Sequence, residues 1–194
     1  MFGKFFLVTW IVIVSLVITL QMAQHILILP TPKSNNLFVS FIDSFLPGKD
    51  NVTIIHIIPV DCSCSDSLIG ELINNKTSKG VEYVVLLENR FEKEKLLRKE
   101  GYRVKVLDES KISAVGIKAG PVLIIKDGKN LKYVGGYFKT SATIKSNHSK
   151  IIRAYLNKSD ITPFSIYGCP IDKELKEAFN PFLWFREWVL GVIA

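Results

Sequence analysis

The sequence is short of several residue types, and each shortage excludes a class of protein. Three cysteines are too few for a small secreted domain that disulfides hold together. Eight prolines and 12 glycines in 194 residues exclude a collagen-like or low-complexity chain. No segment repeats at the period of a solenoid or a propeller. Charged residues make up 22% of the chain and hydrophobic residues 48%, which excludes disorder over most of its length.

The chain also lacks a concentrated basic surface pattern, although it carries a net charge of +7. Its 25 lysines and arginines are scattered among 18 acidic residues instead of forming a stripe. Nucleic-acid binding needs such a stripe or patch to follow the phosphates. We therefore expect no nucleic-acid partner.

The N-terminal segment is the longest uncharged stretch. After Lys4, residues 5–20 (FFLVTWIVIVSLVITL) contain no charge, whereas a membrane-spanning helix needs about 20 apolar residues. A span becomes possible if residues 21–23 lie among the lipid headgroups. We expect residues 1–24 to be a membrane anchor or a signal peptide. An uncleaved anchor is favoured, because cleavage after Ala23 would place Gln21 where a small residue is required.

An anchor of this kind fixes the expected compartment. The default orientation leaves the N-terminus in the cytoplasm and the rest of the chain outside. In a bacterium, the protein would be a single-pass protein of the inner membrane with its domain in the periplasm. The periplasm is oxidising, so cysteine pairs are stable there.

Residues 25–49 read as a linker followed by a short amphipathic helix. Pro47 and Gly48 end the helical pattern. Before them, apolar residues recur at helical spacing: Leu37, Phe38, Phe41, Ile42 and Phe45.

Residues 50–157 carry the pattern of an α/β domain. The β-branched runs 52–60 and 81–87 predict strands that are buried on both faces. Further expected elements are helices over 65–75, 91–100 and 149–156, a short strand over 102–107, and a hairpin of strands 121–126 and 131–134. This order predicts a mixed sheet with helices on both faces.

Residues 158–194 are expected to form a C-terminal extension. Cys169 lies between Gly168 and Pro170, in a predicted turn ahead of a helix over 171–179. The apolar, amphipathic tail at residues 182–194 is too short to span a bilayer. It either rests in the headgroup layer or packs on the domain.

Two cysteines stand where the first buried strand meets the following helix. Cys62 and Cys64 lie within the segment DCSCSD, at the carboxyl end of the strand, where reactive groups are accessible in α/β folds. Unpaired backbone N–H groups at a helix start favour a thiolate. Asp61 and Asp66 oppose this effect, because nearby carboxylates raise a thiol pKa. We expect the Cys62 thiol to be less acidic than the corresponding thiol of a strong oxidant.

A second group of motifs follows along the chain. Gly116-Ile117 is followed by Pro121, then by the Asp127-Gly128 turn and by Gly135-Gly136-Tyr137. The Gly120–Pro121 bond is a candidate for the cis isomer. Together with the cysteine pair at a helix start, this pattern resembles a thioredoxin-like domain. The N-terminal anchor and the Cys-x-Cys motif are similar to those of membrane-anchored bacterial thioredoxin-like proteins.

The resemblance implies a thiol–disulfide oxidoreductase that acts on the thiols and disulfides of other proteins without a cofactor. Cys62 would be the exposed attacking cysteine and Pro121 the cis-proline beside the cysteine pair. The family pattern is Cys-x-x-Cys, whereas this chain has Cys-x-Cys, so a Cys62–Cys64 bridge needs a tight turn outside regular helix. Cys169 is left with several roles: resolving thiol, partner of Cys62 or Cys64, third metal ligand, or spectator.

Two other functions remain open. Cys62, Cys64 and Cys169 supply soft sulfur ligands of the kind that Cu(I) prefers, so copper binding or delivery is the alternative. No histidine has a spacing that singles it out as a ligand. His56 is expected to be a buried, hydrogen-bonded core residue, His148 to be solvated, and His25 to adjoin the anchor. The third possibility is a non-catalytic interaction domain with a structural Cys62–Cys169 bridge.

Overall fold

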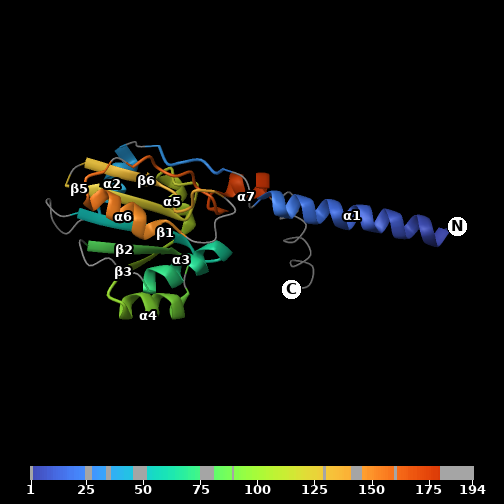
Figure 1. Ribbon diagram of the computed structural model, residues 1–194, viewed down its shortest axis with the longest axis horizontal. Helices are drawn as coiled ribbons and strands as arrows, with labels where there is room; N and C mark the ends of the chain where they lie inside the picture. The colour runs from blue at the N-terminus through green and yellow to red at the C-terminus, as the bar shows by residue number, and fades with distance from the viewer. Residues whose placement is uncertain are drawn as a thin grey trace.

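The computed structural model describes residues 2–24, 28–33, 36–45, 52–74, 81–88, 90–128, 130–140, 146–159 and 161–179. Within these ranges the chain forms a sheet with helices on both sides, and one long helix leads away from it (Figure 1). His25 and the tail at residues 182–194 lie outside the described residues.

The central sheet of the described chain has five strands in the order β3-β2-β1-β5-β6. Strands β1 (Val52–Pro59), β2 (Val81–Leu87) and β3 (Arg103–Leu107) run parallel, and β5 (Val122–Asp127) and β6 (Asn130–Gly135) continue the sheet antiparallel. The predicted mixed sheet and the hairpin around the Asp127-Gly128 turn are therefore confirmed.

Alternate residues of the buried strands belong to two separate apolar clusters, one on each face of the sheet, because side chains of a strand alternate between its faces. Ile54 and Ile58 point to one face of β1, whereas Ile55 and Ile57 point to the other. Helices α3 (Ser63–Asn74), α4 (Phe91–Lys99) and α6 (His148–Leu156) cover the first face. Helices α2 (Asn36–Asp43) and α5 (Glu109–Ala114) cover the second face. Helices on both faces were predicted, and the structure confirms them.

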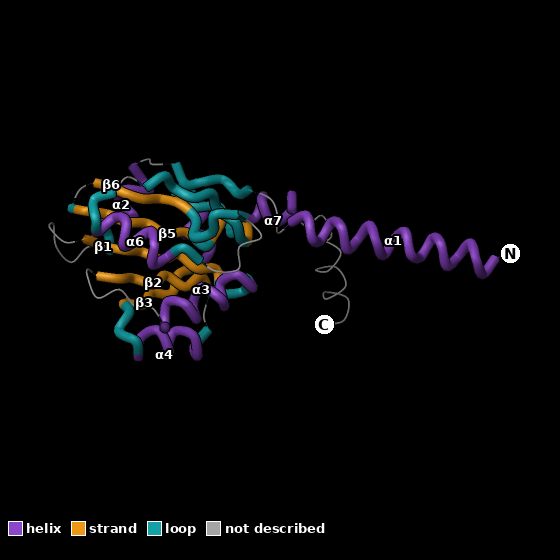
Figure 2. Tube along the Cα trace, in the orientation of Figure 1, coloured by secondary structure: helices purple, strands orange, loops and turns teal. Residues whose placement is uncertain are grey.

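Helix α1 (Phe2–Gln24) projects away from the sheet, as Figure 2 also shows. Its apolar side chains face solvent, with Phe6 70% and Trp10 59% exposed. The predicted transmembrane helix is not confirmed, because no helix in the described part of the chain combines the length and apolarity that crossing a membrane requires.

The residues assigned to the C-terminal extension return to the domain. Ile166 pairs with Leu29, and Phe164 pairs with Gly136, each in an isolated antiparallel bridge. Farther on, β7 (Cys169–Pro170) pairs antiparallel with β4 (Ala119–Gly120), and α7 (Lys173–Phe179) follows. Ile166 is fully buried in the second apolar cluster, so this segment is part of the packed fold.

Candidate functional site

Cys62 lies in the short connection between β1 and α3. Its carbonyl oxygen accepts a hydrogen bond from the backbone N–H of Ser65 at 2.9 Å, which places Cys62 at the start of the helix. The side chain is only 3% exposed. The expectation that Cys62 is presented to solvent is therefore wrong for this state of the protein. The reason is a long-range contact, because the segment that carries Cys169 covers it.

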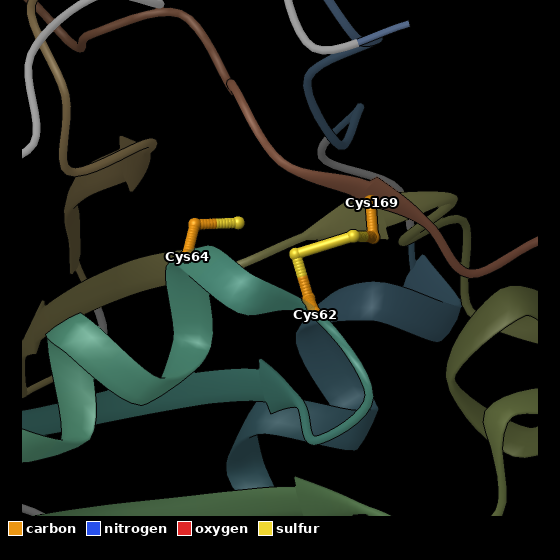
Figure 3. Close-up of side chains that lie close together, drawn as sticks. All are labelled: Cys62, Cys64 and Cys169. Carbon is orange, nitrogen blue, oxygen red and sulfur yellow. A yellow bond between two sulfur atoms is a disulfide. The ribbon is translucent and has the colours of Figure 1, made fainter. Parts of the chain in front are cut away.

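Cys62 and Cys169 form a disulfide across 107 residues of sequence, with their Cα atoms 5.9 Å apart (Figure 3). This is the pairing expected of a structural bridge, and it is also one of the pairings left open for a redox site. Cys169 is partly exposed, so the disulfide is more accessible from the Cys169 side than from the Cys62 side.

Cys64 keeps its thiol and lies in the first turn of α3. Its side chain points toward the disulfide in Figure 3, and the three sulfur atoms lie within 4.8 Å of one another. Burial raises the pKa of the Cys64 thiol, and the Asp66 carboxylate raises it further. Burial contributes more to this shift than the carboxylate does. The expectation of a less acidic thiol concerned Cys62, and it stays a prediction because a bridged cysteine does not titrate.

Two cations at the start of α4 (Phe91–Lys99) pair with the carboxylates that flank the cysteines: Arg90, the residue before the helix, and Lys93 in its first turn. Arg90 forms an ion pair with Asp61 and lowers the pKa of that carboxyl group. Lys93 forms an ion pair with Asp66 and also donates a hydrogen bond to the backbone carbonyl of Val60 at 3.1 Å. Sequence reasoning missed both cations, because their pairing with residues about 30 positions earlier depends on how α4 packs beside α3.

The Gly120–Pro121 bond is cis, as the sequence suggested, and it lies beside the Cys169 segment. Gly120 is paired with Cys169 in the β4–β7 ladder. Gly168 permits this approach, since a Cβ atom there would lie 2.0 Å from the Gly120 carbonyl oxygen and 2.7 Å from Pro121 Cδ. The predicted site residues Cys62, Cys64, Pro121 and Cys169 are thus brought together at one end of the sheet.

Asp172 holds the segment beyond Cys169 in place. Its carboxylate accepts hydrogen bonds from the backbone N–H groups of Glu174 and Leu175 at 3.1 and 3.3 Å, which caps α7. The Ser113 hydroxyl of α5 also bonds to this carboxylate. The backbone N–H groups of Ile171 and Asp172 donate to the carbonyl oxygen of Lys118 at 2.8 and 3.0 Å.

A second group of polar side chains lies between the sheet and α6. His56 on β1, Glu82 on β2 and His148 at the start of α6 are all at most 5% exposed. His56 is buried and hydrogen-bonded to Tyr137, as expected, with its Nδ1 2.8 Å from the phenol oxygen. The expectation that His148 is solvated is wrong. Burial lowers the pKa of His56 and lowers that of His148 to about 4, so both imidazoles are neutral at pH 7.

No protein-family model matches this chain, and no curated protein matches it at a significant level.

Proposed function

We propose that the protein is a thiol–disulfide oxidoreductase on a thioredoxin-like fold, with Cys62, Cys64 and Cys169 as its reactive groups. The observation that carries the proposal is the cluster of three sulfur atoms within 4.8 Å, of which two are bridged and one is a thiol. A bridge with a purely structural role needs no third sulfur beside it. A redox site gains from one, because a nearby thiol lets the bridge rearrange without unfolding.

The exchange is a pair of sulfur displacements. In the reduced protein, the Cys62 thiolate attacks a sulfur of a partner's disulfide, and the partner's second sulfur leaves as a thiolate and takes up a proton. The Cys169 thiolate then attacks the Cys62 sulfur and releases the partner's first sulfur. The partner gains two electrons, and the protein is left with the Cys62–Cys169 bridge. The reverse sequence oxidises a partner dithiol, and no cofactor takes part.

Cys64 adds an internal exchange to this scheme. Its thiolate attacks the Cys62 sulfur, which forms a Cys62–Cys64 bond and releases the Cys169 thiolate, which takes up a proton. Because Cys64 lies within α3, this bond requires the first turn of the helix to open. No electrons enter or leave the protein in this step. The raised pKa of Cys64 keeps most of this residue in the unreactive thiol form at neutral pH, so the exchange is slow until a base removes the proton.

The β4–β7 ladder supports a role for Pro121 at the edge where a partner peptide would bind. In the bridged state, Cys169 occupies the backbone edge of Gly120, next to the cis-proline. Strand addition to an exposed edge is a common mode of peptide recognition. The protein's own Cys169 segment would therefore have to leave this edge before a partner peptide docks there.

We also propose that α1 anchors the protein to a membrane, with the domain in the bacterial periplasm. The exposed apolar side chains of α1 support this placement, and so does a disulfide that is stable in an oxidising compartment. Carbonate extraction of membranes tests it. Retention of the protein in the pellet is expected, and release into the supernatant would refute the anchor.

The test of the oxidoreductase is reduction of insulin by the full chain in the presence of glutathione. Wild-type protein is expected to accelerate the reaction. Cys62→Ser is expected to abolish the acceleration, and Cys64→Ser, the matched control, to retain part of it. Full activity in Cys62→Ser contradicts the assignment. No activity in the wild-type protein leaves the Cys62–Cys169 bridge with a structural role only.

Binding of Cu(I) is the second candidate, because three thiolates at these separations form a soft ligand set. Copper would be cargo, and it requires the bridge to be reduced first. Anaerobic titration of the reduced chain with Cu(I) tests this reading. Tight binding of one ion that Cys64→Ser removes favours it, and the same binding in Cys64→Ser and wild type refutes it.

A further inference from the structure

The buried group formed by His56, Glu82 and His148 has no part in sulfur exchange. The three residues come from β1, β2 and the first turn of α6, and one possible ligand atom from each lies within 4.8 Å of the other two. Each is at most 5% exposed. Burying a polar nitrogen costs free energy unless it finds a partner, so the two buried imidazoles require an explanation.

The hydrogen bonds of Tyr137 fix the orientation of His56. The Tyr137 hydroxyl has one hydrogen, which it donates to the backbone carbonyl of Val122 at 3.4 Å. The phenol oxygen lies 2.8 Å from Nδ1 of His56, and it accepts the Nδ1–H in the tautomer that carries its proton there. In that tautomer, the lone pair of Nε2 faces the Glu82 carboxylate, 3.9 Å from Oε2. Two electron-rich atoms that face each other in a buried site are unfavourable unless a positive charge lies between them.

His148 adds a third donor to the same space. Its ring centre lies 5.2 Å from that of His56. Within the described part of the chain, neither ring nitrogen of His148 has a hydrogen-bond partner, and Nε2 of His56 has none either. Nε2 of His56 and a ring nitrogen of His148, beside the Glu82 carboxylate, form a donor set of two nitrogens and one oxygen.

We propose that His56, Glu82 and His148 bind a divalent transition-metal ion, with Zn²⁺ as the best match. Two histidines and one carboxylate are an established ligand set for Zn²⁺, whereas Ca²⁺ and Mg²⁺ prefer oxygen ligands alone. Ligand atoms around a tetrahedral zinc ion lie about 3.4 Å apart. The Nε2–Oε2 separation of 3.9 Å therefore needs to shorten by about 0.5 Å. The other separations, which are within 4.8 Å, need to shorten by up to about 1.4 Å as the side chains close on the ion. The Tyr137 hydrogen bond would orient His56 as an outer-shell partner.

The ion would be bound as the chain folds, because the site is buried. Such binding couples metal affinity to folding. It would join β1, β2 and α6 at one point of the first apolar cluster, independently of the oxidation state of the three cysteines. The site is therefore expected to hold its ion in both the reduced and the oxidised protein.

The test uses the full chain with Cys64→Ser, which removes the free thiol as a competing ligand and keeps the disulfide. The protein is refolded with and without Zn²⁺ and then analysed for metal content. One zinc per chain is expected, with a rise in Tm of about 5–10 °C when free Zn²⁺ exceeds Kd about 100-fold. Substitution with Co²⁺ is expected to give a visible ligand-field spectrum without thiolate charge-transfer bands.

Glu82→Gln is the main variant, and Glu94→Gln is its matched control. Glu94 is a carboxylate of α4 that pairs with Arg98 and does not belong to the proposed ligand set. Glu82→Gln is expected to weaken zinc binding at least tenfold, and Glu94→Gln to leave it unchanged. The proposal is overturned if the Cys64→Ser protein takes up no zinc, as purified or after refolding. It is also overturned if Glu82→Gln and His148→Gln bind zinc as tightly as their parent.

Discussion

Removing Cys169 is expected to cost the fold more than removing Cys64, although both cysteines belong to the same cluster. The Cys62–Cys169 bridge closes a loop over a sequence separation of 107 residues. In the chain-entropy description, a loop of this length restricts the unfolded state by about 5 kcal/mol at 25 °C. Measured losses on deleting natural bridges are about 2–5 kcal/mol. We therefore expect Cys169→Ala to lower Tm by roughly 5–15 °C for a domain of this size.

Thermal unfolding followed by circular dichroism measures the effect. Cys64→Ala is the matched control, because it deletes a partly buried sulfur and leaves the bridge in place, so its Tm is expected to fall by only a few degrees. Wild-type protein kept in dithiothreitol should melt close to Cys169→Ala. The reasoning is refuted if Cys169→Ala and Cys64→Ala melt at the same temperature, or if reduction leaves the Tm of the wild type unchanged.

Three further predictions concern the surroundings of the bridge. Gly168→Ala would place a Cβ atom 2.0 Å from a backbone oxygen of β4, and we expect a loss of about 1–3 kcal/mol in the free energy of unfolding. Gly70→Ala is the control on α3, because the added Cβ atom would meet nothing within 4 Å. This substitution is expected to raise the free energy of unfolding by about 0.5–1 kcal/mol. A larger loss in Gly70→Ala than in Gly168→Ala would contradict the packing. The rate at which Cys64 is alkylated in the bridged protein should keep rising with pH after the alkylation rate of glutathione has reached its plateau, because the pKa of Cys64 is raised. A plateau for Cys64 at a lower pH than for glutathione would refute this prediction. Lys93→Gln removes the cation paired with Asp66, so the carboxylate is expected to slow the alkylation of Cys64 by up to about twofold. Lys95→Gln on the same helix is the control and should leave the rate unchanged. Equal rates in the two variants would show that the ion pair has no influence on the thiol.

The sequence predicted the elements whose signal is local. The β-branched runs gave β1 and β2 within one or two residues, and the Asp127-Gly128 turn gave the hairpin of β5 and β6. These segments are short, strongly patterned and bounded by turn residues, so neighbouring residues determine them.

The pairing of the cysteines was not predictable, because three cysteines allow three single bridges and the sequence does not say which are close in space. The choice depends on the return of the segment around Cys169 to the edge of β4, which is a tertiary contact between residues far apart in the chain. The burial of Cys62 follows from the same contact.

The environment of His148 was predicted wrongly because its sequence neighbours are polar. A helical pattern could have revealed its burial, since His148, Ile151 and Ile152 follow the i, i+3, i+4 spacing of one helix face. Glu82 carries an equivalent signal, because it alternates with Val84 and Leu86, which point to the same apolar cluster. In both cases the period of the element predicts the face better than the charge of the residue does.

The central claim is that the Cys62–Cys169 bridge exchanges with thiols while the domain stays folded. The most direct measurement incubates the full chain in glutathione buffers of increasing reducing power, quenches with acid and maps the disulfides by mass spectrometry, with circular dichroism recorded on the same samples. We predict a reversible transition from the bridge to free thiols in folded protein, reached more slowly in Cys64→Ser. A bridge that survives every glutathione ratio, or that opens only when the domain unfolds, would contradict the account.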